Sequence, residues 1–327
     1  MYLFYFFKVA VNQLFVFFVL RAIFLFFLGM VIVSCVRENE DKEERLPVPQ
    51  NTIYQPPSLP TVIINQAEQL TYLLNHYWDE FDFADMPKRH DQAYFEQAFA
   101  SYAYMLSQVD SVAKSQSVNR LMDRVWKYGH TTAKQVDEVA ENYLANPNSP
   151  IRNEDSYIAF LNEILKREEL NDIDKLRARE LLRMIRKNRP GSVAADFSYI
   201  TADNQIGSIH SIRAAHTILF FNNPGCEECE TIKEVMINTP VFATGEELAI
   251  AAIYIDNNIA EWKATDYPNA WINAQTSAID ENMLYDLKAM PTLYLLDAQK
   301  RVILKDATLE QIATLLTKRI TRITHHE

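Results

Sequence analysis

The N-terminal half of the chain holds a long stretch in which apolar residues recur every three or four positions, as they do on the buried face of a helix. Segments with this spacing include Phe95, Phe99, Tyr102, Leu106 and Val109, and later Tyr157, Phe160, Leu161, Ile164 and Leu165. A turn-rich segment at residues 146–150 interrupts the pattern before a helix that we expect to begin near Asp155. The spacing predicts an all-α domain of about six helices over residues 61–188.

Beyond residue 190 the pattern changes from a helical to a strand-like period. Short apolar or β-branched runs occupy residues 217–221, 248–255, 292–296 and 301–304, and helix-compatible segments lie between them. Strands that alternate with helices indicate an α/β sheet. We therefore expect an α/β domain at residues 189–327, with residues 256–283 as an insert whose Trp271 either covers the active site or, as we prefer, belongs to the core of the insert.

The first 34 residues are almost entirely apolar. Residues 22–33 form an unbroken apolar run of twelve positions, which suits a signal peptide better than a membrane span of about 20 residues. The run ends in Ile32, Val33, Ser34 and Cys35, which resembles the bacterial lipobox, and this resemblance implies that Cys35 is lipidated and becomes the first mature residue. An uncleaved anchor at residues 9–33 is the alternative. Both place the rest of the chain in the cell envelope, outside the cytoplasm.

Residues 35–60 are rich in acids and prolines, and we expect them to form a solvated, stiff tether. The acidic run after Cys35 also resembles the surface-export signal of Bacteroidota lipoproteins, with a simple spacer as the alternative. The aromatic residues that follow are interleaved with acids, and we expect them to pack in the helical core rather than to form a groove for a partner. They are Tyr72, Tyr77, Trp78, Phe81 and Phe83.

Composition and charge exclude several classes of protein. Of the 327 residues 48% are hydrophobic and 23% charged, which is typical of a folded chain and excludes a disordered or multi-span membrane protein. The formal net charge of -11, from 32 Lys and Arg against 43 Asp and Glu, provides no basic surface for nucleic acid. The chain has 3 cysteines, too few for a disulfide-stapled scaffold.

Two of those cysteines form a Cys-x-x-Cys motif, Cys226 and Cys229, between a predicted strand and the helix-compatible residues 230–237. At the start of a helix, positions i and i+3 lie on one side about 5 to 6 Å apart, within reach of a disulfide. The positive end of the helix dipole stabilises the thiolate of the first cysteine. We therefore predict Cys226 as the nucleophile and Cys229 as the resolving thiol, in a site that needs no cofactor and no metal.

A second element, Met290-Pro291-Thr292, directly precedes a predicted strand. Together with the Cys-x-x-Cys motif and residues 191–197 it resembles the thioredoxin superfamily, and most closely its membrane-anchored, extracytoplasmic thiol-disulfide oxidoreductases. The resemblance covers about residues 188–320. It implies a thioredoxin-like fold, a cis peptide bond at Pro291, and contacts of Met290 and Pro291 with the backbone of a substrate.

The helical part carries a resemblance of its own. Residues 146–157 and 77–79 are similar to a domain of unknown function that precedes thioredoxin-like domains in Bacteroidota lipoproteins. This resemblance covers most of the helical part and implies no activity for it. His76, His90 and His130 lie far apart, without the spacing of metal ligands.

The motif departs from the family pattern in two places. Gly225 stands where the family has a tryptophan, and Phe220 stands where thioredoxin has a buried acid. Three carboxylates, Glu227, Glu228 and Glu230, surround the thiols and disfavour the thiolate electrostatically. A less stable thiolate favours the disulfide form, so we expect the pair to reduce its partners rather than to oxidise them.

The leading functional hypothesis is a lipid-anchored thiol-disulfide oxidoreductase that acts on protein thiols and disulfides outside the cytoplasm. The family resemblance implies a membrane reductant as its electron donor. The alternative is a binding lipoprotein of the surface or periplasm, in which the thioredoxin-like domain is a scaffold with a structural disulfide. A metal pair at the two cysteines lacks further ligands, and the proline-threonine-cysteine pattern of peroxiredoxins is absent around Cys226.

Overall fold

The structure is a computed structural model that describes residues 53–84, 86, 92–279 and 283–324. The predicted signal peptide, Cys35 and most of the predicted tether lie outside these residues. Within the part that is described, no helix combines the length and the apolar character that crossing a membrane requires.

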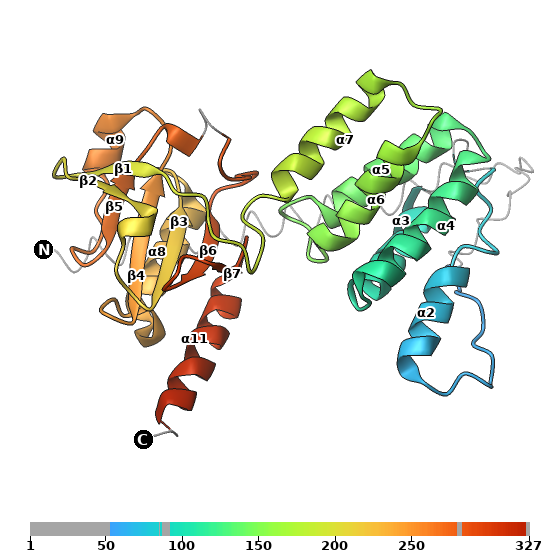
Figure 1. The fold of residues 1–327 in the computed structure, drawn as a ribbon, viewed down its shortest axis with the longest axis horizontal. Coiled ribbons are helices and arrows are strands. Elements are labelled where there is room, and N and C mark those ends of the chain that lie inside the picture. The colour runs from blue at the N-terminus through green and yellow to red at the C-terminus, as the bar shows by residue number, and fades with distance from the viewer. Residues whose placement is uncertain (1–52, 85, 87–91, 280–282, 325–327) are drawn as a thin grey trace, which may run out of the picture. The chain divides into compact units, whose positions relative to one another are not determined.

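An all-helical region precedes the sheet, as the apolar periodicity predicts (Figure 1). Within the described residues it consists of α2 (Gln66–His76), α3 (Gln92–Ser107), α4 (Ser111–Trp126), α5 (His130–Leu144), α6 (Glu154–Lys166) and α7 (Asp172–Ile185). Several of these helices begin at a side chain that accepts backbone N–H groups of the first turn, which would otherwise have no partner within the helix. These N-cap residues are Asn65, Asp110, Asn153 and Asn171.

Aromatic side chains form much of the core of the helical region. Tyr77, Trp78, Phe81 and Phe83 are buried and their rings contact one another, which confirms the expectation of core packing for them. Tyr54, which falls within the segment expected to be a solvated tether, is also buried here. Its backbone N–H donates to Gln97 Oε1 at 3.1 Å and its hydroxyl donates to the carbonyl oxygen of Tyr77. The end of that segment is therefore packed on the helical core.

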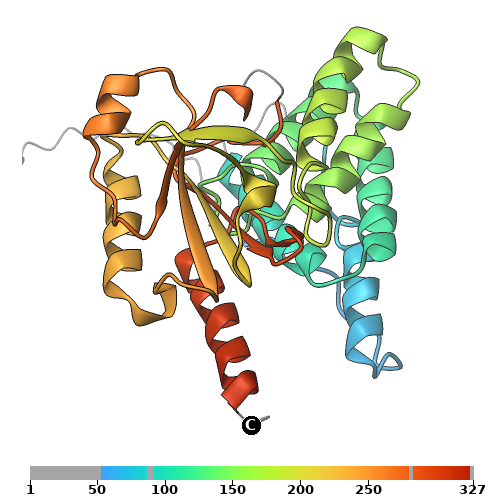
Figure 2. The ribbon, with the colours of Figure 1, turned by 60° about the vertical axis from the view of Figure 1, so that its left-hand side comes forward.

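The second half of the described chain is an α/β domain built on a mixed sheet. Its elements are β1 (Ser198–Thr201), β2 (Ile206–Ser208), η1 (Ile209–Ser211), β3 (His216–Phe221), α8 (Glu227–Asn238), η2 (Pro240–Phe242), β4 (Leu248–Tyr254), α9 (Ile259–Ala264), β5 (Ile272–Gln275), β6 (Thr292–Asp297), β7 (Val302–Leu304) and α11 (Leu309–Thr324). The strand order is β2-β1-β5-β4-β3-β6-β7. β3 pairs in parallel with β4 and antiparallel with β6, so β3 lies inside the sheet (Figures 1 and 2).

The central strands are buried on both faces because their alternate side chains enter two different cores. From β3, Ile218 and Phe220 pack with residues of α8 and α11, whereas Leu219 and Phe221 pack in the core of the opposite face. This two-sided burial accounts for the continuous apolar runs by which the sequence predicts β3, β4 and β6. An α/β domain that follows an all-α region agrees with the predicted fold class.

Three strands of the sheet were not expected. β1, β2 and β5 are only 4, 3 and 4 residues long, and their burial patterns include exposed or half-buried positions, so none has a clear apolar period. The interpretation of residues 256–283 as an insert is therefore wrong in part, because β5 lies within this segment and pairs with β4 and β1. Its pairing partners lie far away in the sequence, and no local pattern reveals them.

Candidate functional site

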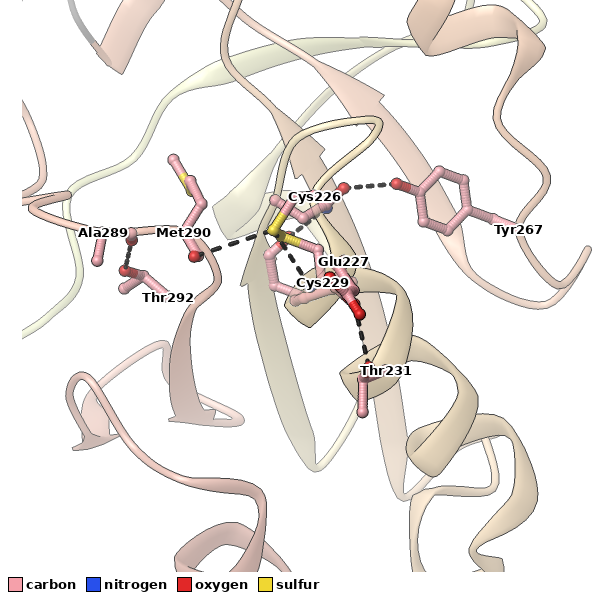
Figure 3. Close-up of a disulfide and its surroundings, with 10 residues drawn as sticks. Cys226, Glu227, Cys229, Thr231, Tyr267, Ala289, Met290 and Thr292 are labelled. Carbon is pink, nitrogen blue, oxygen red and sulfur yellow. Dashed lines mark hydrogen bonds between the residues drawn. A yellow bond between two sulfur atoms is a disulfide. The ribbon is translucent and has the colours of Figure 1, made fainter. Parts of the chain in front are cut away.

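The cysteine pair lies where β3 gives way to α8 (Figure 3). The chain leaves β3 at Phe221, and Gly225 has a φ of 73°, a conformation in which an L side chain is strained. Cys226 is the N-cap of α8, and its Sγ atom accepts a hydrogen bond from the backbone N–H of Cys229 at 3.2 Å. This turn places the sulfur of Cys226 at the positive end of the helix.

Cys226 and Cys229 form a disulfide, with their Cα atoms 5.2 Å apart. The two cysteines differ in exposure: Cys226 is partly exposed, whereas the Cys229 side chain is 2% exposed. An external sulfur can therefore approach Cys226 but not Cys229. This asymmetry fits the roles predicted from the sequence, with Cys226 as the attacking thiol and Cys229 as the resolving thiol.

The Met290–Pro291 peptide bond is cis, as the family resemblance implies. The Sγ atom of Cys226 lies 3.9 Å from the carbonyl oxygen of Met290, and the hydroxyl of Thr292 donates to the carbonyl oxygen of Ala289 at 2.6 Å. The loop before β6 is thus held against the cysteine pair, although 64 residues separate Cys226 from Met290. The tertiary structure brings Cys226, Cys229 and Met290 to one place, with Pro291 next in the chain.

Beneath the disulfide lies an apolar core. Cys229 packs in the cluster that also contains Phe220 and Trp271, whose rings meet edge to face at 6.5 Å. Phe220 is buried, so an aromatic ring stands at the position of the buried acid of thioredoxin. Trp271 is 9% exposed and shares the core of Cys229. Trp271 is thus a core residue, as we preferred, and its ring lies 6.4 Å from that of Tyr267 in the same segment. The core it joins is the one that contains Cys229 rather than a core of the insert alone.

The charges around the disulfide are more balanced than the sequence suggests. Glu227 and Glu228 are exposed at the first turn of α8, but Glu230 forms an ion pair with Lys233 on the same helix. The ammonium of Lys233 also lies 5.3 Å from the centre of the Tyr267 ring. The cation of Lys233 offsets one of the three carboxylates, so Glu227 and Glu228 carry most of the negative charge next to the thiols.

Tyr267 connects the segment before β5 to the active-site loop. Its hydroxyl donates to Asn222 Oδ1 at 2.5 Å, and the amide of Asn222 donates to the carbonyl oxygen of Phe220 at 2.9 Å. Burial and the nearby charge of Glu230 raise the pKa of Tyr267 to about 12, so the hydroxyl stays protonated and acts as a donor. Figure 3 shows Tyr267 on the side of the disulfide opposite Met290.

Two residues near the site were not singled out from the sequence. Asn222 is buried beside the loop, and Glu261 of α9 approaches Gly225, where an added Cβ would lie 3.8 Å from its Oε1 atom. Asn222 directly follows an apolar strand, and a polar residue at the end of such a strand is a sequence signal that could have identified it as a site residue. Glu261 lies 35 positions beyond Cys226 in a short helix and has no such signal. Within the described residues no group of three or more His, Cys, Asp or Glu could hold a metal ion.

Comparison with known proteins gives matches for both halves of the chain. A family model described as a domain of unknown function (DUF5106) matches residues 34–188. A search of curated proteins finds no match.

Several solved structures resemble the chain. A thioredoxin-like protein from Bacteroides caccae is 33% identical, with a TM-score of 0.76, and the match covers 81% of this chain and 98% of that one. The C-terminal domain of an uncharacterized protein from Bacteroides fragilis is 38% identical over 40% of this chain and 98% of its own, with a TM-score of 0.39. A domain of a possible thiol-disulfide isomerase from Cytophaga hutchinsonii is 20% identical over 43% of this chain and 99% of its own, with a TM-score of 0.35.

The match to the Bacteroides caccae protein spans the helical region as well as the sheet, since it covers 81% of this chain. It agrees with a mixed sheet that follows an all-helical region. The chain therefore belongs to the family of thioredoxin-like proteins that the Bacteroides caccae structure represents.

Proposed function

We propose that the protein is a lipid-anchored thiol-disulfide oxidoreductase of the cell envelope, which reduces or exchanges disulfides in partner proteins through Cys226 and Cys229. One observation carries this proposal: the disulfide lies at the start of α8 with Cys226 partly exposed, Cys229 buried and the Met290 carbonyl 3.9 Å from the outer sulfur. An external sulfur can approach Cys226, while Cys229 lies within reach of it, with the two Cα atoms 5.2 Å apart.

The chemistry follows from thiol exchange. The Cys226 thiolate attacks one sulfur of a partner disulfide, and the other partner sulfur leaves as a thiolate. The Cys229 thiolate then attacks Sγ of Cys226, which releases the second partner sulfur and forms the Cys226–Cys229 disulfide. Two electrons pass from the cysteine pair to the partner. A dithiol reductant of the membrane restores the pair by the reverse exchange.

A purely structural role for the disulfide is less consistent with its surroundings. The bridge joins two cysteines with a sequence separation of only 3, so the loop it closes is short and it removes little entropy from the unfolded state. Its outer sulfur is accessible, and the N–H of Cys229 points at that sulfur, where it would stabilise a thiolate. These features serve an attacking group, and a structural bridge needs none of them.

The surroundings of the pair suggest how a partner is bound. The Met290 loop offers its backbone beside Cys226, and an extended segment of a partner can pair with such an edge. Glu227 and Glu228 are exposed in the first turn of α8, and Glu261 lies beside Gly225. This acidic rim favours partner disulfides with basic residues nearby.

The location and the anchor rest on the sequence. The apolar run at residues 22–33 and the lipobox-like residues before Cys35 support export and lipidation. Mass spectrometry of the protein from its native membrane tests this part, because a chain that begins at Cys35 carries a mass increment from its acyl groups. A chain that keeps residues 1–34 would favour the uncleaved anchor.

The central experiment measures the redox midpoint of the Cys226–Cys229 pair in the full chain. The protein is equilibrated in glutathione or dithiothreitol buffers, the thiols are alkylated, and the peptide with both cysteines is quantified by mass spectrometry. We expect a reversible transition between about -150 and -300 mV, in the range of exchange-competent pairs. Cys35 appears in a separate peptide and does not disturb the measurement.

A disulfide that resists reduction until the protein unfolds would overturn the proposal. Far-UV circular dichroism across the titration separates the two cases, since an exchange-competent pair is reduced while the helical signal stays unchanged. Cys226→Ser serves as the control, because it removes the transition without changing the buried core around Cys229.

A further inference from the structure

One feature of the helical region that the thiol chemistry does not explain is a cavity of about 440 Å³ among α4, α5, α6 and α7. These helices pack against one another, and α5, α6 and α7 lie together in Figures 1 and 2. The volume is in the range of small-molecule sites. Much of the wall is apolar, and the apolar side chains include Met122, Leu161, Ile164, Leu170 and Leu181.

Polar atoms in this wall lack partners. Trp126 Nε1 and Asp137 Oδ1 are buried and have no hydrogen-bond partner among the described residues, and the buried Tyr157 hydroxyl faces the carboxylate of Glu141. The Tyr157 side chain is 0% exposed. Buried polar groups are normally hydrogen-bonded, so two such atoms in the wall of one cavity call for an explanation. A ligand that offers donors to Asp137 and an acceptor to Trp126 would satisfy them.

The charges of the wall define the ligand further. The Nη1 and Nη2 atoms of Arg177 each donate to the carboxylate of Glu141 at 2.6 Å, and the ammonium of Lys134 lies 3.7 Å from the carboxylate of Glu138. The cations of the wall are therefore already paired with carboxylates. Asp137 has no ion pair of this kind among the described contacts, and the cavity is left with a surplus of negative charge.

We propose that this cavity binds a small organic amine: an ammonium group placed at Asp137, an apolar stem along the wall, and an oxygen acceptor at Trp126 Nε1. The carboxylate of Asp137 accepts hydrogen bonds from the ammonium group, and the hydroxyl oxygen of Tyr157 is a second acceptor for the same group. Pairing an apolar wall with a few oriented polar groups is the usual design of a small-molecule site. The proposal goes beyond the thiol chemistry and does not depend on it.

Binding should depend on pH because burial, with help from Glu141 and Glu138, raises the pKa of Asp137 to about 7. The groups that face Asp137 are Glu138 and Glu141 on its own helix, Arg177 on α7 and the Tyr157 hydroxyl on α6. The other ionisable residues that line the cavity are His130, Lys134 and Asp174. The lining residues from α4 are Met122 and Trp126, which carry no charge. An ammonium ligand selects the ionised carboxylate, so we expect affinity to rise about tenfold from pH 6 to pH 8.

Calorimetric titration of the full chain tests the proposal with three matched probes. Tyramine carries both the amine and the oxygen, 2-phenylethylamine lacks the oxygen, and 4-ethylphenol lacks the amine. We expect tyramine to bind more tightly than 2-phenylethylamine, and 4-ethylphenol to bind at least tenfold more weakly than tyramine. A set of primary alkylamines with four to eight carbons extends the test to other stems.

Two substitutions locate the binding site. Asp137→Asn should weaken tyramine binding by at least about tenfold at pH 8 and remove the pH dependence. Trp126→Phe should weaken tyramine binding about threefold to tenfold while leaving 2-phenylethylamine within about twofold, because only the indole N–H is lost. Glu168→Gln removes an exposed carboxylate outside the cavity and should leave both amines unchanged.

Three results would overturn the proposal. One is that no amine of the set binds the wild-type chain. Another is that the amines bind but Asp137→Asn retains the full affinity and pH dependence, and the third is that 4-ethylphenol binds as tightly as tyramine. The Trp126→Phe comparison decides the question even if Asp137→Asn fails to fold, since the difference between the two amines is measured within one variant.

Discussion

The Sγ atom of Cys226 accepts a hydrogen bond from the backbone N–H of Cys229 at 3.2 Å. The side chain of Cys226 therefore caps α8, and Cys229 lies in the first turn of this helix. In the reduced protein the same N–H would face the Cys226 thiolate. A backbone donor and the helix dipole act on the attacking sulfur, while Cys229 stays in the apolar core below it. This division predicts different behaviour for the two cysteines.

Replacing the resolving thiol should trap partner proteins. In Cys229→Ala the Cys226 thiolate still attacks a disulfide, but nothing releases the product, so mixed disulfides accumulate and are seen as high-mass bands on non-reducing gels. Cys226→Ala should give no such bands, because Cys229, the remaining cysteine of the pair, is 2% exposed. Equal trapping by both variants would contradict the assignment of the roles.

Removing the exposed carboxylates of the first turn should make Cys226 more reactive. In the Cys229→Ala background, Glu227→Gln together with Glu228→Gln should raise the rate at which iodoacetamide alkylates Cys226 at pH 7 by about threefold. The reason is that fewer negative charges then oppose the thiolate. The rate is followed on the Cys226 peptide by mass spectrometry. Glu310→Gln, an exposed carboxylate on α11, is the control and should change nothing.

Removing the cation of Lys233 should act in the opposite direction. In the Cys229→Ala background, Lys233→Gln frees Glu230 from its ion pair, so the negative charge near Cys226 rises and its alkylation by iodoacetamide at pH 7 should slow by about twofold. High salt should shrink the effect, because screening weakens charges near the surface. Lys318→Gln, at an exposed position on α11, is the matched control. A faster reaction in Lys233→Gln would show that Glu230 does not act on the thiols.

Tyr267→Phe should destabilise the thioredoxin-like domain. The substitution leaves Asn222 Oδ1 without its donor in a buried position, which costs about 1–3 kcal/mol of unfolding free energy. Urea unfolding followed by fluorescence and circular dichroism measures the loss.

The same substitution carries a prediction about alkaline pH. The pKa of Tyr267 in the folded protein is raised to about 12, against 10.0 in an unfolded chain. The protonated hydroxyl therefore stabilises the fold fully below pH 10, and this contribution is lost as the pH rises from 10 towards 12. The difference between wild type and Tyr267→Phe should be constant from pH 6 to 9 and should shrink above pH 10. A difference that varies between pH 6 and 9 would point to another titrating group.

Asp137→Asn should change the pH dependence of stability even without a ligand. Burial raises the pKa of Asp137 from 3.8 to about 7, so the stabilising contribution of the neutral carboxyl is complete below pH 3.8 and disappears as the pH rises through 7. Relative to Asp137→Asn, the wild-type chain should lose about 2–4 kcal/mol of unfolding free energy between pH 4 and pH 8. Urea unfolding at a series of pH values measures this. Glu168→Gln should follow the wild type, and parallel curves for wild type and Asp137→Asn would show that Asp137 titrates normally.

The elements with a strong local signal were predicted from the sequence. β3, β4 and β6 are continuous apolar runs because both of their faces are buried, and the helices of the N-terminal region show the spacing of a single buried face. β1, β2 and β5 were missed because each is short and stands partly exposed, so its place in the sheet depends on pairing with distant strands.

The sequence by itself determined the fold class and the chemical groups: a Cys-x-x-Cys pair before a helix, a Met-Pro-Thr element before a strand, and a helical region ahead of both. Such signals are local, because helix periods and the spacing of two cysteines are set by neighbouring residues. Only the tertiary structure decided that Lys233 offsets Glu230, that Tyr267 binds Asn222, and that Asp137, Tyr157 and Trp126 meet at one cavity. These relationships join side chains whose distances depend on how helices and strands pack, and packing is a property of the whole fold.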